Sequence, residues 1–179
     1  MAIGGAVLAL AALLAACSSG GEPSPDVPGA PNLALADFTI STYQGADVIG
    51  GEETTLAAAL EHADKPIVLN FWAGLCPPCR AEMPHFQEVY DERSDEVLLL
   101  GIDIGPFQLL GTREEGRALL AELDVDYPAG TTYQETILRD LEILGMPTTF
   151  FIRRDGALHA KWAGLLTKDK LNELIDEML

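Results

Sequence analysis

The sequence IVLNFW at positions 67–72 leads directly into a pair of cysteines, Cys76 and Cys79, which are separated by two prolines. A continuous apolar run of this kind is typical of a strand buried on both faces of a sheet. If Cys76 caps the following helix, Pro77 and Pro78 take its first positions, where a missing N–H costs no helical hydrogen bond. The chain must therefore fold so that a buried strand presents two thiols at the start of a helix.

The rest of the chain alternates between strand patterns and helix patterns. Apolar or alternating runs predict strands, and amphipathic runs predict helices. The expected strands are 37–45 (an edge strand or hairpin), 67–72, 97–105, 148–152 and 158–164, and the expected helices are 54–66, 77–93, 113–123, 134–144 and 167–179. This order predicts one α/β domain over residues 33–179, with a central mixed sheet and helices on both faces.

The charge of the chain restricts its partners. The 179 residues carry a formal net charge of −17 at pH 7. Nucleic acid is excluded as a partner because phosphate binding needs clustered Lys and Arg. The acidic residues are spread along the chain, which is typical of a heavily solvated surface.

The N-terminal segment has the pattern of an export signal. Residues 1–16 are small, apolar and uncharged, and they are too short to span a bilayer comfortably. The sequence LAAC that ends at Cys17 resembles the lipobox of bacterial lipoproteins, which implies a lipid on Cys17. Residues 17–32 are rich in Pro and Gly and are expected to form a tether. An ordinary secretory signal or an uncleaved anchor are the alternatives, and all three place the domain outside the cytoplasm.

The residues alone leave three uses open for the cysteine pair: a redox couple, half of a metal site, or an inert staple. At a helix N-terminus the Cys76 thiolate is stabilised by the helix dipole and free N–H groups. Cys79 lies three residues on, on the same side of the first turn, where it can close a disulfide with Cys76. Because Pro77 and Pro78 offer no N–H, the thiolate is stabilised only modestly, which favours a reducing couple.

The paired motifs WAGLCPPC and GMPTTFFI together resemble the thioredoxin superfamily. The sequence CRAEMP and an extra segment at about 104–130 resemble its TlpA and ResA group of membrane-tethered thiol-disulfide oxidoreductases. The resemblance covers about residues 33–179 and implies a thioredoxin fold with an N-terminal strand extension and a central insertion. It implies that Cys76 attacks a partner disulfide, that Cys79 resolves the mixed disulfide, and that Pro147 forms a cis-proline loop beside the dithiol, where an extended substrate segment docks.

Glu82 lies three residues beyond Cys79 and is expected over the same helical face. In the ResA-like proteins a Glu at this spacing tunes the protons of the dithiol, because a nearby carboxylate raises thiol pKa values and can carry a proton. Asn70 stands where many thioredoxins have a buried Asp, and it cannot titrate. The alternative for Glu82 is an ordinary solvated side chain.

Metal chemistry has little support in the sequence. A zinc site needs four ligands, and the chain has no second cysteine pair. Its histidines, His62, His85 and His159, are scattered without ligand spacing. A copper-delivery protein of the same superfamily is the best non-enzyme alternative, although that group has three residues between its cysteines and a distal His. His159 is the conceivable distal ligand. No metal and no cofactor are expected.

Two further uses of the cysteines are disfavoured. The peroxiredoxin relatives place Pro seven and Thr or Ser three residues before the reactive Cys, whereas Leu69 and Ala73 stand at those positions before Cys76. A thiol-peroxidase-like activity is therefore a weak alternative. A purely structural disulfide would close a very short loop and would stabilise the fold little.

The sequence GPFQLLG at residues 105–111 places Phe107, Leu109 and Leu110 in an expected loop. These side chains either cover the core or dock a redox partner.

The combined prediction is a lipid-anchored, extracytoplasmic thioredoxin-fold enzyme, which exchanges the Cys76–Cys79 pair with partner disulfides and acts as a reductase. The resemblance implies protein substrates such as apocytochrome c thiols or the cysteines of copper-site assembly proteins, and a membrane thiol carrier as the electron donor.

Overall fold

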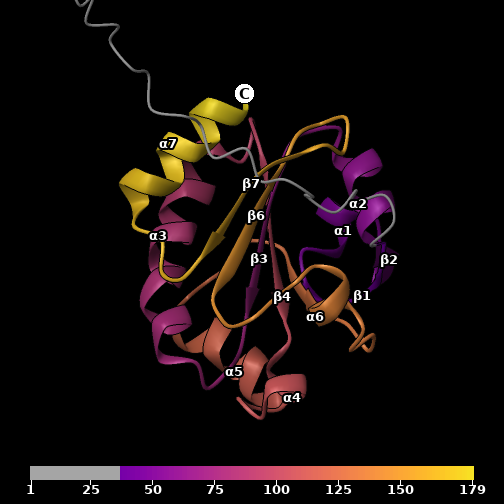
Figure 1. Cartoon of the computed structure of the whole chain (residues 1–179), viewed down its shortest axis with the longest axis vertical. Coiled ribbons are helices and arrows are strands. Elements are labelled where there is room, and N and C mark those ends of the chain that lie inside the picture. The colour runs from indigo at the N-terminus through magenta and orange to yellow at the C-terminus, as the bar shows by residue number, and fades with distance from the viewer. Residues whose placement is uncertain (1–36) are drawn as a thin grey trace, which may run out of the picture.

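A seven-stranded mixed sheet forms the middle layer of the computed structural model, which describes residues 37–179 (Figure 1). The strand order is β2-β1-β5-β4-β3-β6-β7. Neighbours β3, β4 and β5 run parallel, and every other pair is antiparallel. The strands are β1 Thr39–Gln44, β2 Glu53–Thr55, β3 Ile67–Trp72, β4 Leu98–Asp103, β5 Ala129–Thr131, β6 Thr148–Ile152 and β7 Leu158–Ala163.

Helices cover both faces of this sheet, as predicted (Figure 1). They are α1 Ala46–Ile49, α2 Leu56–Ala63, α3 Pro77–Arg93, α4 Gly105–Gln108, α5 Arg113–Glu122, α6 Ile137–Asp140 and α7 Lys168–Met178. One core lies under α3, α5 and α7, and the other lies under α1, α2 and α6. Along β3, Val68 and Trp72 face the first core, whereas Leu69 and Phe71 face the second. Both faces of β3 are therefore buried, which explains its unbroken apolar sequence.

Local sequence signals set several helix ends where they were expected. Thr55 and Thr167 cap α2 and α7 by accepting backbone N–H groups from Ala58 and Lys170. These bonds satisfy amide groups that a helix leaves unpaired at its start. The β6–β7 hairpin turns at Gly156, whose φ of 83° suits a residue without a side chain.

Three expectations about the elements were wrong. Strand β1 is not at the edge, because β2 lies outside it, although β1 and β2 do form an antiparallel pair. The helix expected over residues 134–144 shrinks to α6, since Glu142 adopts a φ of 51° and Ile143 N–H bonds back to Leu138 O (2.7 Å), which ends the helix. The expected loop at residues 105–111 begins with the single turn α4.

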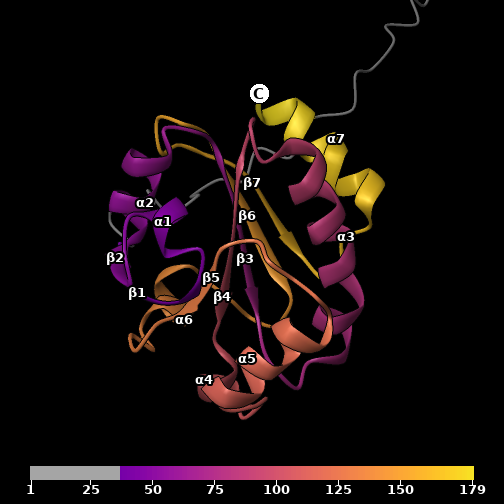
Figure 2. The ribbon, with the colours of Figure 1, turned by 180° about the vertical axis from the view of Figure 1, so that it is seen from behind.

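The expected insertion, at about residues 104–130, is present as α4, α5 and β5. Figure 2 shows α4 and α5 at the end of the sheet where α3 begins. The proposed signal at residues 1–16, the tether at 17–32 and Cys17 lie outside the described residues. Between residues 37 and 179, the helices are each too short or too polar to cross a bilayer.

Candidate active site

Cys76 and Cys79 form a disulfide at the start of α3, with their Cα atoms 5.3 Å apart. Cys76 is the N-cap of the helix, and Pro77 and Pro78 follow it, as predicted. The Cys79 N–H donates to Cys76 Sγ over 3.3 Å, and neither proline can add a donor. Cys76 is 3% exposed and Cys79 is fully buried. An incoming sulfur therefore has access to Cys76 before Cys79.

The loop before β6 lies at the same end of the sheet. Strand β6 begins beside the end of β3, where Thr148 pairs with Phe71, so the preceding Met146 and Pro147 come close to the level of the disulfide. The Met146–Pro147 bond is cis, as the resemblance implied. Met146 packs against the core that contains both cysteines. Pro147 O accepts the N–H of Gly164 (2.9 Å), which ties this loop to the end of β7.

Glu82 is fully buried, so the alternative of a solvated helix residue is wrong. Its Oε1 accepts a hydrogen bond from Asn70 Nδ2, and its Oε2 accepts one from the backbone N–H of Leu166, both at 2.9 Å. Burial raises the pKa of the Glu82 carboxyl to about 7, although both hydrogen bonds act in the opposite direction. This carboxyl group, one helical turn beyond Cys79, can thus hold or release a proton at neutral pH.

Other polar groups are buried in the same part of the fold as Glu82. Among the residues that the structure describes, Trp72 Nε1, Tyr127 OH and Asn70 Oδ1 are buried without a hydrogen-bond partner. Burial, and secondarily the charge of Glu82, raise the pKa of Tyr127 above its ordinary value. The Glu82 carboxylate is therefore close to this tyrosine, in a region that is polar although it is enclosed.

Asp103 is a second buried carboxylate, which the sequence analysis missed. It ends β4 directly beside Trp72 of β3, and it accepts hydrogen bonds from Gly105 N–H (2.9 Å) and Tyr43 OH (3.0 Å). Burial raises its pKa to about 6. The signal was an acidic residue at the carboxyl end of a buried parallel strand, where α/β sheets place functional groups.

Asp103 leaves no room for a side chain at Gly116 of α5. A Cβ atom there would lie 2.2 Å from Asp103 Oδ2. We expect Gly116→Ala to lower the free energy of unfolding by about 2 kcal/mol, because overpacking outweighs the better helix propensity of Ala. Urea titration measures the change. Gly145→Ala is the matched control, since a Cβ at Gly145 would contact nothing within 4 Å. Equal effects of both substitutions would contradict this prediction.

The three histidines are dispersed over the fold. His85 contacts Leu166 O, and His62 contacts Asp47 O. His159 follows Leu158, which pairs with Ile152 of β6. Ile152 in turn pairs with Ile67, the first residue of β3, so His159 lies near the start of β3. That is the far end from Cys76, about 17 Å along the strand. Within residues 37–179, no group of three or more His, Cys, Asp or Glu side chains is placed to hold a metal ion. His159 cannot join Cys76 as a copper ligand in this fold.

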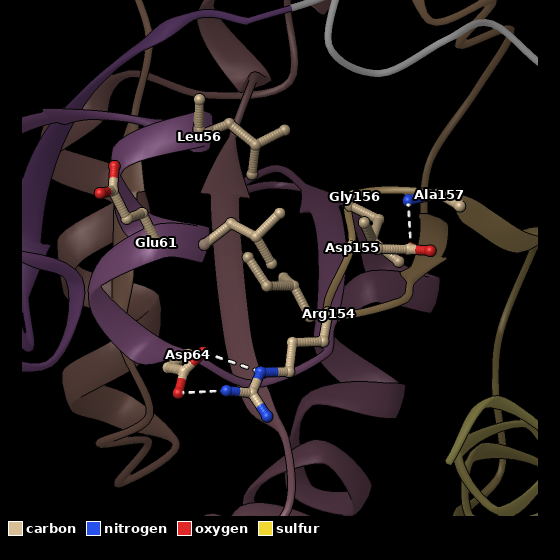
Figure 3. Close-up of a pocket in the computed structure, with 11 residues that line it drawn as sticks. Leu56, Glu61, Asp64, Arg154, Asp155, Gly156 and Ala157 are labelled. Carbon is tan, nitrogen blue, oxygen red and sulfur yellow. Dashed lines mark hydrogen bonds and ion pairs between the residues drawn. The ribbon is translucent and has the colours of Figure 1, made fainter.

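A large groove also lies at the far end of the sheet, between α2 and the β6–β7 turn (Figure 3). Its volume is about 570 Å³, and Leu56, Ile67 and Ile152 contribute to its lining. Of the charged residues that line it, Asp64 binds Arg154 and Asp155 accepts the N–H of Ala157, so Glu61 is the remaining acidic side chain. This groove holds no arrangement of groups that points to catalysis.

A thioredoxin-like α/β sheet with a Cys-x-x-Cys disulfide at the end of its central strand, and a cis-proline loop at the same end, defines the class of thiol-disulfide oxidoreductases. The chain belongs to the AhpC/TSA family, whose model matches residues 30–161. It is 34% identical over 115 residues to "Thiol-disulfide oxidoreductase ResA" of Oceanobacillus iheyensis, a match that covers 64% of this chain and 57% of the relative. The chain thus aligns with little more than half of that relative.

Two other proteins match more completely. "Sporulation thiol-disulfide oxidoreductase A" of Bacillus subtilis is 24% identical over 176 residues, which cover 96% of this chain and 93% of the relative. The exposed lipoprotein thioredoxin of Streptococcus pneumoniae has a TM-score of 0.64 at 23% identity, with 79% of this chain and 98% of that structure covered. The second match shows the shared fold.

Family membership does not introduce peroxidase chemistry at this site. Leu69 and Ala73, at the positions that carry Pro and Thr or Ser in peroxiredoxins, are fully buried. Ala73 lacks the hydroxyl that Thr or Ser would offer to a peroxide. The geometry therefore favours exchange between thiols and disulfides over reduction of peroxide.

Proposed function

We propose that this protein is a lipid-anchored, extracytoplasmic thiol-disulfide reductase that acts on other proteins. The observation that carries this proposal is the setting of Cys76 Sγ. The sulfur sits at a helix N-terminus, yet it receives the N–H of Cys79 and none from Pro77 or Pro78. A thiolate with few donors is less stabilised, so the dithiol form is a better electron donor.

The proposed exchange transfers two electrons and two protons to the partner. The Cys76 thiolate attacks one sulfur of the partner disulfide, the partner S–S bond breaks, and the departing thiolate takes a proton. Cys79 then loses its proton and attacks Cys76 Sγ, which forms the Cys76–Cys79 bond and releases the second partner thiol. Glu82, which is buried one turn from Cys79 and has a pKa of about 7, accepts the Cys79 proton. The Pro147 loop aligns the partner segment.

Substrates and location follow from the resemblance and the N-terminal sequence. Apocytochrome c or copper-site proteins would receive the electrons, a membrane thiol carrier would supply them, and no cofactor takes part. The named relatives include a ResA and a lipoprotein thioredoxin, which supports this assignment. A lipid on Cys17 and a tether at residues 17–32 would hold the domain at a membrane surface outside the cytoplasm.

The test is the equilibrium reduction potential of the full chain. Redox buffers of dithiothreitol or glutathione are followed by acid quench, thiol alkylation and mass spectrometry of the peptides that contain Cys76 and Cys79. We expect one two-electron midpoint below about −230 mV. A midpoint above about −180 mV would instead identify an oxidase or isomerase.

A further inference from the structure

Large apolar side chains that are exposed gather near the disulfide. Between residues 37 and 179, those that are at least 40% exposed are Leu75, Leu109, Tyr133, Leu144, Leu165 and Leu179. Leu75 directly precedes Cys76, Leu144 precedes the cis-proline loop, and Leu165 adjoins the residue that binds Glu82. Leu179 ends the chain at the opposite pole from α4 and α5 (Figure 1). In so acidic a protein, this distribution marks the pole that holds the disulfide, α4 and α5 as a contact surface.

Leu109 is the most unusual of these residues. It is 94% exposed, and its φ of 56° lies in the left-handed region, which Gly or Asn tolerates and Leu does not favour. Its neighbours have structural roles: Phe107 packs on one core and Leu110 on the other. Leu109 thus lowers stability through its backbone conformation, and its exposed side chain gains almost no burial in return. Such a strained residue points to a function.

Leu109 and Leu75 line the same open groove, of about 590 Å³. The insertion is fixed against the cysteine loop here, because Leu75 N–H donates to Leu110 O over 2.8 Å. Gly74 also lies against the backbone of α5, where a Cβ atom would be 2.7 Å from Gly116 N. The groove is therefore a built feature of the fold, and it begins one residue from Cys76.

A redox partner must touch this groove. Cys76 is only 3% exposed, and the exposed residues around it in the chain are Leu75, Pro77 and Pro78. A mixed disulfide requires the two sulfurs to approach to about 2 Å, so the partner residues that flank its cysteine cover these side chains. Glu114 and Glu115 outnumber Arg113 along the groove, and Arg113 already stacks on the ring of Tyr133. The local charge disfavours an acidic occupant.

We propose that the groove between Leu75 and Leu109 docks a non-acidic segment of the partner protein that carries a large apolar side chain close in sequence to its reactive cysteine. This inference rests on the proposed exchange function and names the class of segment that it serves. Leu109 takes no part in the chemistry. It selects the partner by contact, and it is therefore exposed in the free protein.

The test compares Leu109→Asn with the unchanged full chain, both in the reduced form. One probe is a ten-residue peptide whose central cysteine is a mixed disulfide with glutathione and is flanked by leucines, and the second has serines instead. The third probe is oxidised glutathione. Acid quench and mass spectrometry give the rates. We expect about a tenfold loss with the leucine peptide, no change with oxidised glutathione, and a melting temperature that stays equal or rises, since Asn tolerates the left-handed backbone.

Leu179→Asn is the matched control, because Leu179 is 61% exposed at the far pole. An unchanged rate with the leucine peptide, or equal losses in both variants or with all three probes, would overturn the docking proposal. If Leu109→Asn lost self-association while its peptide rates stayed unchanged, the groove would belong to an interface with a second copy. If it lost binding to phosphatidylglycerol vesicles instead, the groove would belong to a membrane contact. Failure of the unchanged chain to react with oxidised glutathione would reject the proposed function itself, which is a different outcome.

Discussion

Cys79→Ser is expected to accumulate a stable mixed disulfide with its substrate, while Cys76→Ser shows no exchange above the uncatalysed rate. The reason is access: Cys76 caps α3 and is the more exposed of the two residues, whereas Cys79 is fully buried. Cys76 can therefore attack without Cys79, but the product cannot then be released. Non-reducing electrophoresis and intact mass after incubation with a peptide disulfide measure the trapped adduct.

The double variant, with Ser at both positions, is the control for adducts formed at Cys17. It should form no adduct through the domain and should keep the fold. Trapping by Cys76→Ser, with none by Cys79→Ser, would show that the order of attack is reversed.

Glu82→Gln is expected to remove most of a pH-dependent loss of stability. The carboxyl has an ordinary pKa of 4.5 and a folded pKa of about 7. Between these values the unfolded chain releases the proton that the folded protein keeps, so the free energy of unfolding falls as pH rises and levels off above about pH 7. The shift corresponds to about 3 kcal/mol. In urea titrations from pH 4.5 to 8, the total fall in the free energy of unfolding should be smaller by this amount in Glu82→Gln.

Glu88→Gln is the matched control, because Glu88 is exposed on the same helix. Asp103, with a pKa of about 6, adds a slope of the same sign, and it contributes equally to the parent and to both variants. The Gln side chain also loses one of the two hydrogen bonds, which shifts stability equally at every pH. If the parent and Glu82→Gln had the same pH slope, Glu82 would not be the buried titrating group.

The same variant tests the role of Glu82 in exchange. Loss of a buried negative charge near the dithiol stabilises the thiolate, so the reduction potential should become less negative. We expect the exchange rate of the parent to have an inflection near pH 7, where Glu82 titrates, and this inflection should disappear in Glu82→Gln. A change in stability alone, with an unchanged potential and rate profile, would leave Glu82 a structural role only.

Local patterns predicted the active-site end of the fold well. The apolar run at residues 67–72, the two prolines and the capping threonines Thr55 and Thr167 all act within one element, through propensity and hydrogen bonds to nearby backbone. Prediction failed for α6 and for the place of β1. The apolar residues at 137–143 fit a helix pattern, but their packing in the core that they share with α1 and α2 accepts a single turn followed by a left-handed residue. Strand β1 lies inside the sheet because the three-residue strand β2 pairs with its outer side, while β5, which follows much later in the chain, pairs with its other side.

The sequence by itself determined where the cysteine pair lies and where α3 begins, because the apolar run before Cys76 and the two prolines after it act on neighbours in the chain. Only the tertiary structure decided how those residues are tuned. Glu82 is buried by the surrounding segments, and hydrogen bonds from Asn70 and from Leu166, which is 84 residues away in the chain, offset part of the cost of its burial. Asp103 and the exposed Leu109 likewise acquire their character from the packing of distant segments. Desolvation depends on every neighbour in space, whereas capping and periodicity depend on neighbours in sequence.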